Sequence, residues 1–308
     1  MSKENTAVTK KKIKRCKEDV VFDAACFIIL TLVLFVVAYP LYWVIISSIS
    51  APSAVSSGKV LLHPIGFTLK GYAEVFKNDQ VMRGFLNSLI ITFCGVMVNL
   101  IVTLPTSYAL SRSNFSGKKP ITIFYLITMF GGGLIPTYLV IQRLQMLNTI
   151  WALILPGCLS VYNMIVARTF FKSNISEELY EAAEIDGCTQ ARFFFQIALP
   201  LSKAIIAILV LYYGVGHWNS YFSALVYISD KAKYPLQLVL RNILITNQTA
   251  LSQTATTAAA RAALQEKQQL IDVMKYSLII ISSIPVLVMY PLVQKHFVKG
   301  VMIGSMKG

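Results

Sequence analysis

Six runs of about 20 apolar residues occur along this chain, and they constrain its fold more than any other feature. They extend approximately over residues 26–49, 85–110, 121–141, 150–171, 201–222 and 276–293. Because an α-helix rises roughly 1.5 Å per residue, about 20 residues suffice to cross a hydrocarbon layer of ~30 Å. The runs therefore predict an all-α, polytopic membrane protein with six transmembrane helices.

The composition of the chain supports this class of protein. Hydrophobic residues make up 56% of the sequence, charged residues only 14%, and the mean hydropathy is +0.62. A soluble domain needs about a quarter of its residues charged to cover its surface. The formal net charge of +14 does not indicate nucleic acid as a partner, because the Lys and Arg residues cluster at the ends of the apolar runs.

Basic residues before the first run orient the chain. Lys3, Lys10 and Arg15 belong to a group of seven that precedes it, which places the N-terminus in the cytoplasm. We expect a basic cytoplasmic tail over residues 1–25, a first transmembrane helix over 26–49, a core of five helices over 84–294 with a cytoplasmic loop at 172–200, and a cytoplasmic tail over 295–308. At over 20 apolar residues the first run is too long for a typical signal peptide, so we expect it to be retained.

Metal and nucleotide chemistry lack the residues that they need. The five Cys and three His residues form no cluster with metal-ligand spacing, so we expect no metal site. No G-x-x-x-x-G-K-[ST] sequence is present, since Gly58-Lys59 and Gly117-Lys118 are followed by Val60 and Lys119. The chain is therefore not expected to hydrolyse ATP through a P-loop.

The cytoplasmic loop contains the most specific motif in the chain, EAAEIDGCTQARFFFQIALP at residues 181–200. Ser176 ahead of two glutamates predicts the N-cap of a helix of about ten residues, and Gly187 predicts its end. Ala182 and Ala183 would let a partner's backbone approach closely, with Glu181 beside them as a charged contact. A second amphipathic piece over residues 189–198 then leads into the fifth run.

This motif resembles the EAA signature of the permease subunits of binding-protein-dependent ABC importers. The residues that we assign to coupling are Glu181, Ala182, Ala183, Asp186, Gly187, Ile197, Leu199 and Pro200. In that family the loop forms a coupling helix, which docks in a cleft of the ATP-hydrolysing subunit. The alternative is an ordinary amphipathic loop helix that ends at Gly187.

Other segments are similar to a narrower group of the family. The C-terminal run Gln294 to Gly308, and Asn87-Ser88 at the second run, resemble the second permease of carbohydrate importers of the maltose type. The run Gly131 to Tyr138 resembles a branch that handles oligosaccharides or complex glycans.

The resemblance implies a type I importer fold in a bacterial cytoplasmic membrane and a non-catalytic subunit. It also implies several partners: a second permease, two ATP-binding subunits that hold ATP and Mg²⁺, an external solute-binding protein and a sugar.

Candidates for a substrate path come from the residues themselves. Gly131, Gly132, Gly133 and Pro136 weaken the third helix near its middle, where broken helices often line a path, although small residues also serve close helix packing. Asn163, Trp218 and Asn219 place polar and aromatic groups near helix ends, where an interfacial belt is the competing explanation. The long segment over residues 223–275 is expected to be external, either as a contact for the binding protein or as a solvated spacer.

The main competing function is an ion-gradient-driven secondary transporter or channel subunit. Such a protein needs acidic residues inside its spans for coupling to protons or sodium. The fourteen Asp and Glu residues lie in tails or loops, apart from Asp23 and Asp272 near the ends of runs. The sequence therefore favours an ATP-driven permease.

Overall fold

The computed structural model describes residues 17–250 and 258–305, and all regular structure in these two ranges is helical. The elements in chain order are α1 (Lys17–Ser48), α2 (Pro52–Ser56), α3 (Lys70–Lys77), α4 (Asp79–Ser111), α5 (Lys118–Gly131), α6 (Leu134–Arg143), α7 (Trp151–Ile154), η1 (Leu155–Gly157), α8 (Val161–Asn174), α9 (Glu177–Ile185), α10 (Gln190–Phe193), the π-helical turn η2 (Phe194–Ala198), α11 (Leu199–Leu201), α12 (Lys203–Trp218), α13 (Tyr221–Tyr227), η3 (Lys231–Lys233), α14 (Leu236–Ala250) and α15 (Ala258–Ser305). The all-α prediction is confirmed.

Three of the six predicted spans are single helices and three are interrupted. The helices α1 and α4, together with residues Gln268–Pro291 of α15, are long and apolar enough to cross a membrane unbroken. The other three runs form bent pairs, with angles of 107° between α5 and α6, 50° at the break before α8 and 80° at the break before α12. Counting each bent pair as one span gives six.

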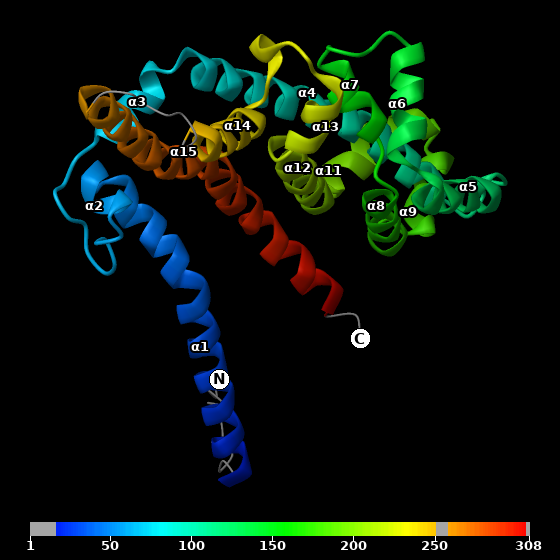
Figure 1. Ribbon diagram of the computed structural model, residues 1–308. Helices are drawn as coiled ribbons and strands as arrows, with labels where there is room; N and C mark the ends of the chain where they lie inside the picture. The colour runs from blue at the N-terminus through cyan, green and yellow to red at the C-terminus, as the bar shows by residue number, and fades with distance from the viewer. Residues whose placement is uncertain (1–16, 251–257, 306–308) are drawn as a thin grey trace.

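Helices α4 and α15 form the frame of the molecule (Figure 1). The helix α4 packs against α8, α12 and α14, while α15 packs against α1, α3 and α12. Apolar clusters fill these junctions, one around Phe171 and Leu209, one around Ile91 and Ile154, and one around Trp218. The body is therefore held together by packing on two central helices.

A row of small and polar residues along α4 faces its neighbours at spacings of about one or two helical turns. Its members are all buried: Ser88, Gly95, Asn99, Thr103 and Ser107. Small residues let membrane helices approach closely, and polar ones hydrogen-bond across the interface. We call these five residues the α4 polar row.

Asn99, in the middle of the α4 polar row, hydrogen-bonds the backbone where the fourth span is broken. Asn99 Nδ2 donates to the Gly157 carbonyl at 2.6 Å, and Asn99 Oδ1 lies 2.7 Å from His217 Nε2. The Ser160 N–H donates to the Tyr213 hydroxyl at 3.2 Å. Backbone groups freed by a helix break in a membrane need such partners, so side chains of α4 and α12 satisfy the interruption.

Asn87 and Ser88 of α4 hydrogen-bond the backbone of residues 232–236 in a similar way. Asn87 Nδ2 donates to the carbonyls of Ala232 and Tyr234 at 2.8 and 3.1 Å, and Ser88 Oγ accepts from Leu236 N–H at 2.8 Å. The described part of the segment predicted as a long external loop is therefore folded, with η3 and α14 packed on α4 and α13 packed on α14.

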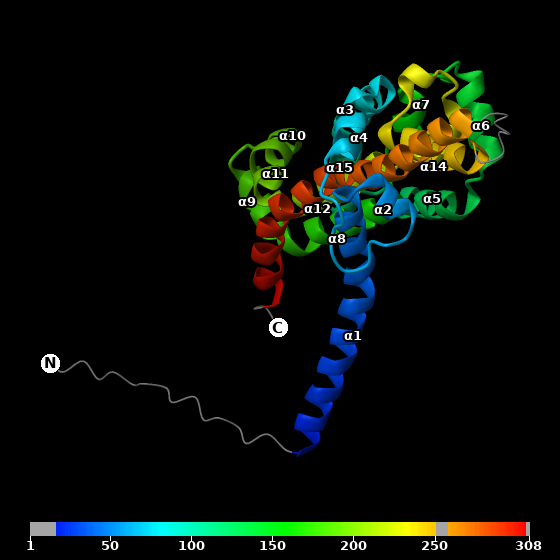
Figure 2. The same ribbon diagram turned by 60° about the vertical axis from the view of Figure 1, so that its left-hand side comes forward.

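The predicted tails are partly helical. Helix α1 begins at Lys17, ahead of the expected boundary at residue 26, and α15 continues to Ser305, beyond the expected end of the last span at 293. Residues 1–16, 251–257 and 306–308 lie outside the described residues, and so do parts of both predicted tails. Figures 1 and 2 show α1 leaving the body, with only its C-terminal end against α15.

Candidate functional site

Helix α9 carries the first part of the sequence motif, and its two ends are set by local hydrogen bonds. Ser176 Oγ accepts from Leu179 N–H at 3.3 Å, which makes Ser176 the N-cap. At the other end Gly187 has φ +76°, its N–H donates to the Glu184 carbonyl at 3.0 Å, and the Cys188 N–H donates to the Ala183 carbonyl at 2.9 Å. This pair of bonds is a Schellman motif, so the predicted start and end of the helix are confirmed.

The two faces of α9 have different environments. Ala183 is only 9% exposed and packs in the same cluster as Phe193, whereas Glu181, Ala182 and Ile185 are exposed. The prediction that both alanines admit a partner is therefore wrong for Ala183. Consecutive helical residues point about 100° apart, and Ala183 turns toward the chain's own core.

Ile185 is an exposed apolar residue of the motif that the sequence did not single out. Its side chain is 87% exposed, more than any other large hydrophobic residue among the described ones. It lies at the last position of α9, directly before the Asp186 cap. The available signal was an isoleucine between polar neighbours in a loop expected to face water.

The second part of the motif is a chain of short helical pieces. Thr189 Oγ1 accepts from Arg192 N–H at 3.3 Å and caps α10, which continues through the π-helical turn η2 into α11. Pro200 lies in the first turn of α11, and Ser202 separates that turn from α12. The fifth run, predicted to begin at residue 201, forms the helix α12 from Lys203.

Ile197 and Leu199 are half-buried against the cluster that contains Ala183, while Pro200 and Asp186 are exposed. Their positions indicate that the first two anchor the loop to the body of the chain. The motif thus contains residues for attachment and residues for contact.

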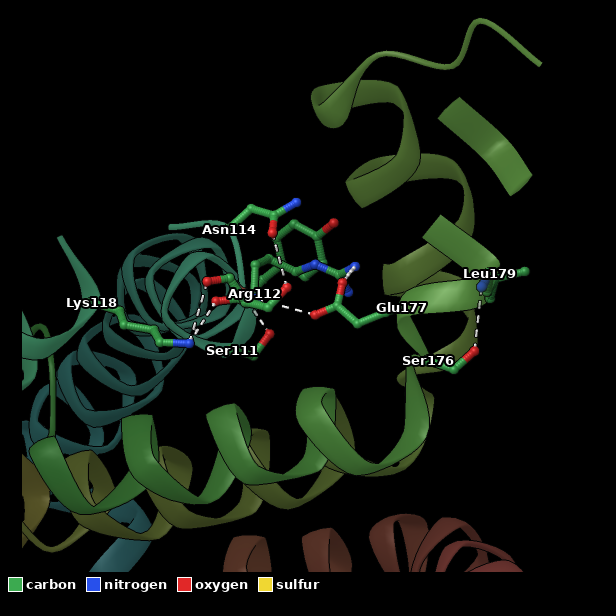
Figure 3. A network of polar contacts seen from close by, with 9 residues as sticks. Ser111, Arg112, Asn114, Lys118, Ser176, Glu177 and Leu179 are labelled. Carbon is green, nitrogen blue, oxygen red and sulfur yellow. Dashed lines mark hydrogen bonds and ion pairs between the residues drawn. The ribbon is translucent and has the colours of Figure 1, made fainter. Parts of the chain in front are cut away.

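An ion pair attaches the start of α9 to the end of α4 (Figure 3). Arg112 Nη2 lies 2.7 Å from Glu177 Oε2, and Ser113 N–H donates to Glu177 Oε1 at 3.1 Å. Partial burial raises the pKa of Glu177, but hydrogen bonds from Ser113 and the charges of Arg112 and Lys118 outweigh it, so its pKa is lowered. The Glu177 carboxylate therefore stays ionised at neutral pH.

Aromatic rings surround the same arginine. The guanidinium carbon of Arg112 lies 4.7 Å from the ring centre of Tyr180, 5.6 Å from that of Tyr108 and 6.0 Å from that of Phe193. Cations within about 6 Å of an aromatic ring centre are attracted to its face. A cavity of 370 Å³, lined by Arg112, Glu177 and aromatic residues of α4, α9 and η2, lies beside this group.

The three glycines of the third run interrupt the helix. Helix α5 ends at Gly131, Gly132 and Gly133 are extended, and α6 begins at Leu134 with Pro136 in its first turn. A Cβ on Gly132 or Gly133 would meet only Thr128 or Pro136 of the same segment. Gly132 and Gly133 thus interrupt the helix, and neither serves close packing against another helix in the described part of the chain.

The other predicted path residues do not gather in one place. Trp218 is 1% exposed and donates from Nε1 to the Ser282 carbonyl at 2.8 Å, so its prediction as a substrate contact is wrong. Asn163 is buried in the first turn of α8, whereas Asn219 is exposed and donates to the Val215 carbonyl at 3.0 Å. Within the described residues, no group of three or more His, Cys, Asp or Glu side chains could hold a metal ion.

Comparisons with known proteins place these features in a family. No model of a protein family matches the chain. The chain is 36% identical over 288 residues to the polygalacturonan/rhamnogalacturonan transport system permease protein YtcP of Bacillus subtilis, covering 93% of this chain and 98% of the relative. It is 38% identical over 289 residues to protein LplC of the same organism, covering 94% and 95% of the two chains.

A solved structure agrees with these relatives. The fold matches, with a TM-score of 0.82 and 27% identity, the crystal structure of a bacterial ABC transporter involved in the import of the acidic polysaccharide alginate, covering 92% of this chain and 99% of that one. The chain spans nearly the full length of all three proteins, and the motif that resembles the EAA signature forms an exposed helix on it. The chain therefore belongs to the family of membrane permease subunits of carbohydrate ABC transporters.

Proposed function

We propose that this chain is one of two permease subunits of an ATP-driven importer for oligosaccharides, and that ATP-hydrolysing subunits drive it through α9. The observation that carries the proposal is the exposed face of this helix. Glu181, Ala182 and Ile185 are exposed on a helix that is firmly capped at both ends. A short rigid helix with one apolar residue and flanking acids fits a groove in a basic partner.

The cargo follows from the names of the relatives. YtcP belongs to a polygalacturonan/rhamnogalacturonan transport system, GanQ of Bacillus subtilis, 29% identical, to a galactooligosaccharides transport system, and the matched crystal structure to an alginate importer. Each of these names refers to a carbohydrate built of several sugar units. We therefore assign oligosaccharides as the substrate class.

The remaining partners complete the importer. A second permease forms the path together with this chain, an external solute-binding protein delivers the sugar, and two further subunits bind ATP and Mg²⁺. The permease itself is non-catalytic and binds no cofactor in this scheme. Both termini and α9 lie on the cytoplasmic side, and the segment over residues 223–275 lies outside, where it contacts the binding protein.

In this mechanism, closure of the ATPase subunits displaces α9 and the membrane helices rearrange. The transporter changes state only to the extent that nucleotide binds its two states with different affinity. Attachment of α9 to the body by Ala183, Tyr180 and the Arg112–Glu177 pair transmits the displacement.

The first test addresses the charged contact. Replacing Glu181 by Lys reverses a charge on the exposed face without touching the caps of α9. We expect membrane insertion at the normal level and loss of ATP-driven uptake in whole cells. Wild-type uptake in this variant would rule out the assigned role of α9.

The second test addresses the apolar contact. Ile185→Ala removes an exposed side chain, so the fold of this chain should not change, but binding of the ATPase subunit should weaken about 30-fold, the size of a 2 kcal/mol contact. Leu62→Ala is the matched control, because Leu62 is 69% exposed in the segment after the first span, on the side opposite to the cytoplasmic N-terminus.

A third measurement separates this function from the competing one. Uptake by proteoliposomes that are supplied with an ion gradient and no ATP would favour the secondary transporter instead.

A further inference from the structure

Helix α9 is joined to its neighbours along the chain by residues outside any helix. Ile175 and Ser176 before it are extended, and Gly187 after it has a positive φ. Single residues of this kind allow a change in direction, so the covalent connections alone leave the orientation of the helix open. Contacts from elsewhere in the chain must fix it.

Arg112 supplies a contact of this kind from the second membrane helix. It directly follows α4, its side chain is 13% exposed, and it bonds Glu177, the first residue of α9. It also lies over Tyr180, one turn further along the same face of α9. One guanidinium thus contacts α9 at two points that are three residues apart.

The arginine is itself held in place on the α4 side. Its guanidinium also lies near the aromatic rings of Tyr108 on α4 and Phe193 on α10. Lys118 Nζ lies 3.4 Å from the Arg112 carbonyl and 3.5 Å from that of Ser113, so it bonds the backbone that carries the side chain. A planar guanidinium can lie flat on a ring and offer several fixed N–H donors to a carboxylate, whereas an ammonium group is a compact point charge on a flexible stem.

The other end of this connection is the frame of the molecule. Helix α4 joins α8 and α12 through the α4 polar row, with hydrogen bonds from Asn99, Thr103 and Ser107. A movement of α9 that reaches Arg112 is therefore delivered to the helix that contacts most of the bundle. The covalent route from α9 to α8 passes instead through the extended residues at 175 and 176.

We propose that Arg112 is a positioning residue that links the coupling helix α9 to α4, and that without this link less of the movement of α9 reaches the membrane helices for each ATP hydrolysed. The proposal rests on the proposed function above, since it assigns a means of transmission to the same helix. It distinguishes Arg112 from the contact residues Glu181 and Ile185, which face the partner.

The test uses the complete transporter, with both permeases, the ATPase subunits and the binding protein, reconstituted in proteoliposomes. The measured quantity is the amount of sugar taken up per ATP hydrolysed, together with the amount of ATPase subunit that copurifies. We expect Arg112→Gln to keep the ATPase bound and active and to lower the uptake per ATP at least 10-fold. Arg112→Lys, which restores the charge without the planar fork, should recover part of this loss.

Two further variants keep the test decisive. Arg83→Gln, at the exposed opposite end of α4, is the matched control and should leave the ratio unchanged. Glu177→Gln, on a side chain that is 45% exposed, is milder and should lower the ratio about 3-fold. If Arg112→Gln does not assemble, the Glu177→Gln result decides, because an unchanged ratio in an intact complex overturns the link.

The double variant tests whether both residues act in one link. Combined, Arg112→Gln and Glu177→Gln should lower uptake per ATP no further than Arg112→Gln alone. Losses that multiply would contradict a shared role. Failure of the wild-type transporter to bind an ATPase or to use ATP would instead refute the proposed function, whereas normal coupling in Arg112→Gln refutes only this inference.

Discussion

Helices α1 and α4 are nearly equal in length, at 32 and 33 residues, yet they occupy opposite environments. The most apolar part of α1 has a mean hydropathy of 2.9, and none of its residues is buried. In the most apolar part of α4 the mean hydropathy is 2.1, and 22% of the residues are buried. The less apolar helix is therefore the central one. In a membrane, apolar surface alone does not bring helices together, because lipid is as apolar as leucine.

What α4 has and α1 lacks is the polar row. Buried small and polar residues recur along α4, while the exposed part of α1 carries large aliphatic and aromatic side chains on every side. Helix α4 therefore lies inside the bundle because of its small and polar residues, and not because it is more apolar than α1. Four predictions test it, and each changes a residue of one of these helices or its direct partner.

Gly95→Ala should have the largest effect. A Cβ at this position would lie 2.5 Å from the His217 ring, so α4 and α12 could not keep their distance. Overpacking of this kind costs roughly 3 kcal/mol. The free energy of unfolding in mixed detergent should fall by that amount, while Gly216→Ala on α12, where nothing lies within 4 Å, should leave it unchanged or raise it.

Asn99→Leu should come next. It removes the hydrogen bond to the Gly157 carbonyl and the contact with His217, and so leaves a partly buried carbonyl and a buried imidazole without these bonds. We expect a loss of about 1.5 kcal/mol, near the upper end for hydrogen bonds in membrane proteins. Asn219→Leu, at an exposed asparagine that bonds within its own helix, is the control. Equal losses in the two variants would contradict the role of the polar row.

Tyr213→Phe should have a smaller effect. It deletes only the hydroxyl that bonds Thr103 at 2.8 Å and accepts from the Ser160 N–H. The expected loss is about 0.6 kcal/mol, the average for such bonds. A double-mutant cycle with Thr103→Val isolates the bond between the two side chains, and a coupling energy of zero would argue against it.

Phe35→Ala on α1 should have the smallest effect. The ring is 70% exposed, so the unfolding free energy of the isolated chain should change by less than about 0.5 kcal/mol. Ile46→Ala near the other end of the same helix is the positive control, because Ile46 is 3% exposed. A clear loss at Phe35 would show that α1 packs against its own chain.

Local rules explain what the sequence made predictable. The six runs, the N-cap at Ser176 and the end at Gly187 depend on residues close together in the chain, and all of these are found. The break at Gly131 to Gly133 was likewise expected as one of two explanations. Each of these features follows from hydropathy, capping or backbone freedom within a few residues.

Long-range contacts explain what was missed. The break in the fourth span was not predicted, and the side chain that supports it, Asn99, lies 58 residues from Gly157. The inward turn of Ala183 and the burial of Trp218 likewise depend on helices from elsewhere in the chain. The pairing of Arg112 with Glu177 crosses 65 residues, and opposite charges at two helix ends do not by themselves specify each other.

The exposed length of α1 also bears on the order of events during synthesis. Protein chains are made from the N-terminus, and a membrane helix satisfies its own backbone before any other helix is present. Because most of α1 needs no contact within this chain, it can take up its position in the bilayer while the remainder is still on the ribosome. Helix α4 must wait for α8, α12 and α14, the last of which begins at residue 236. The central helix α4 therefore sets the time at which the bundle is complete, whereas α1, which precedes it in the chain, can already lie in the membrane.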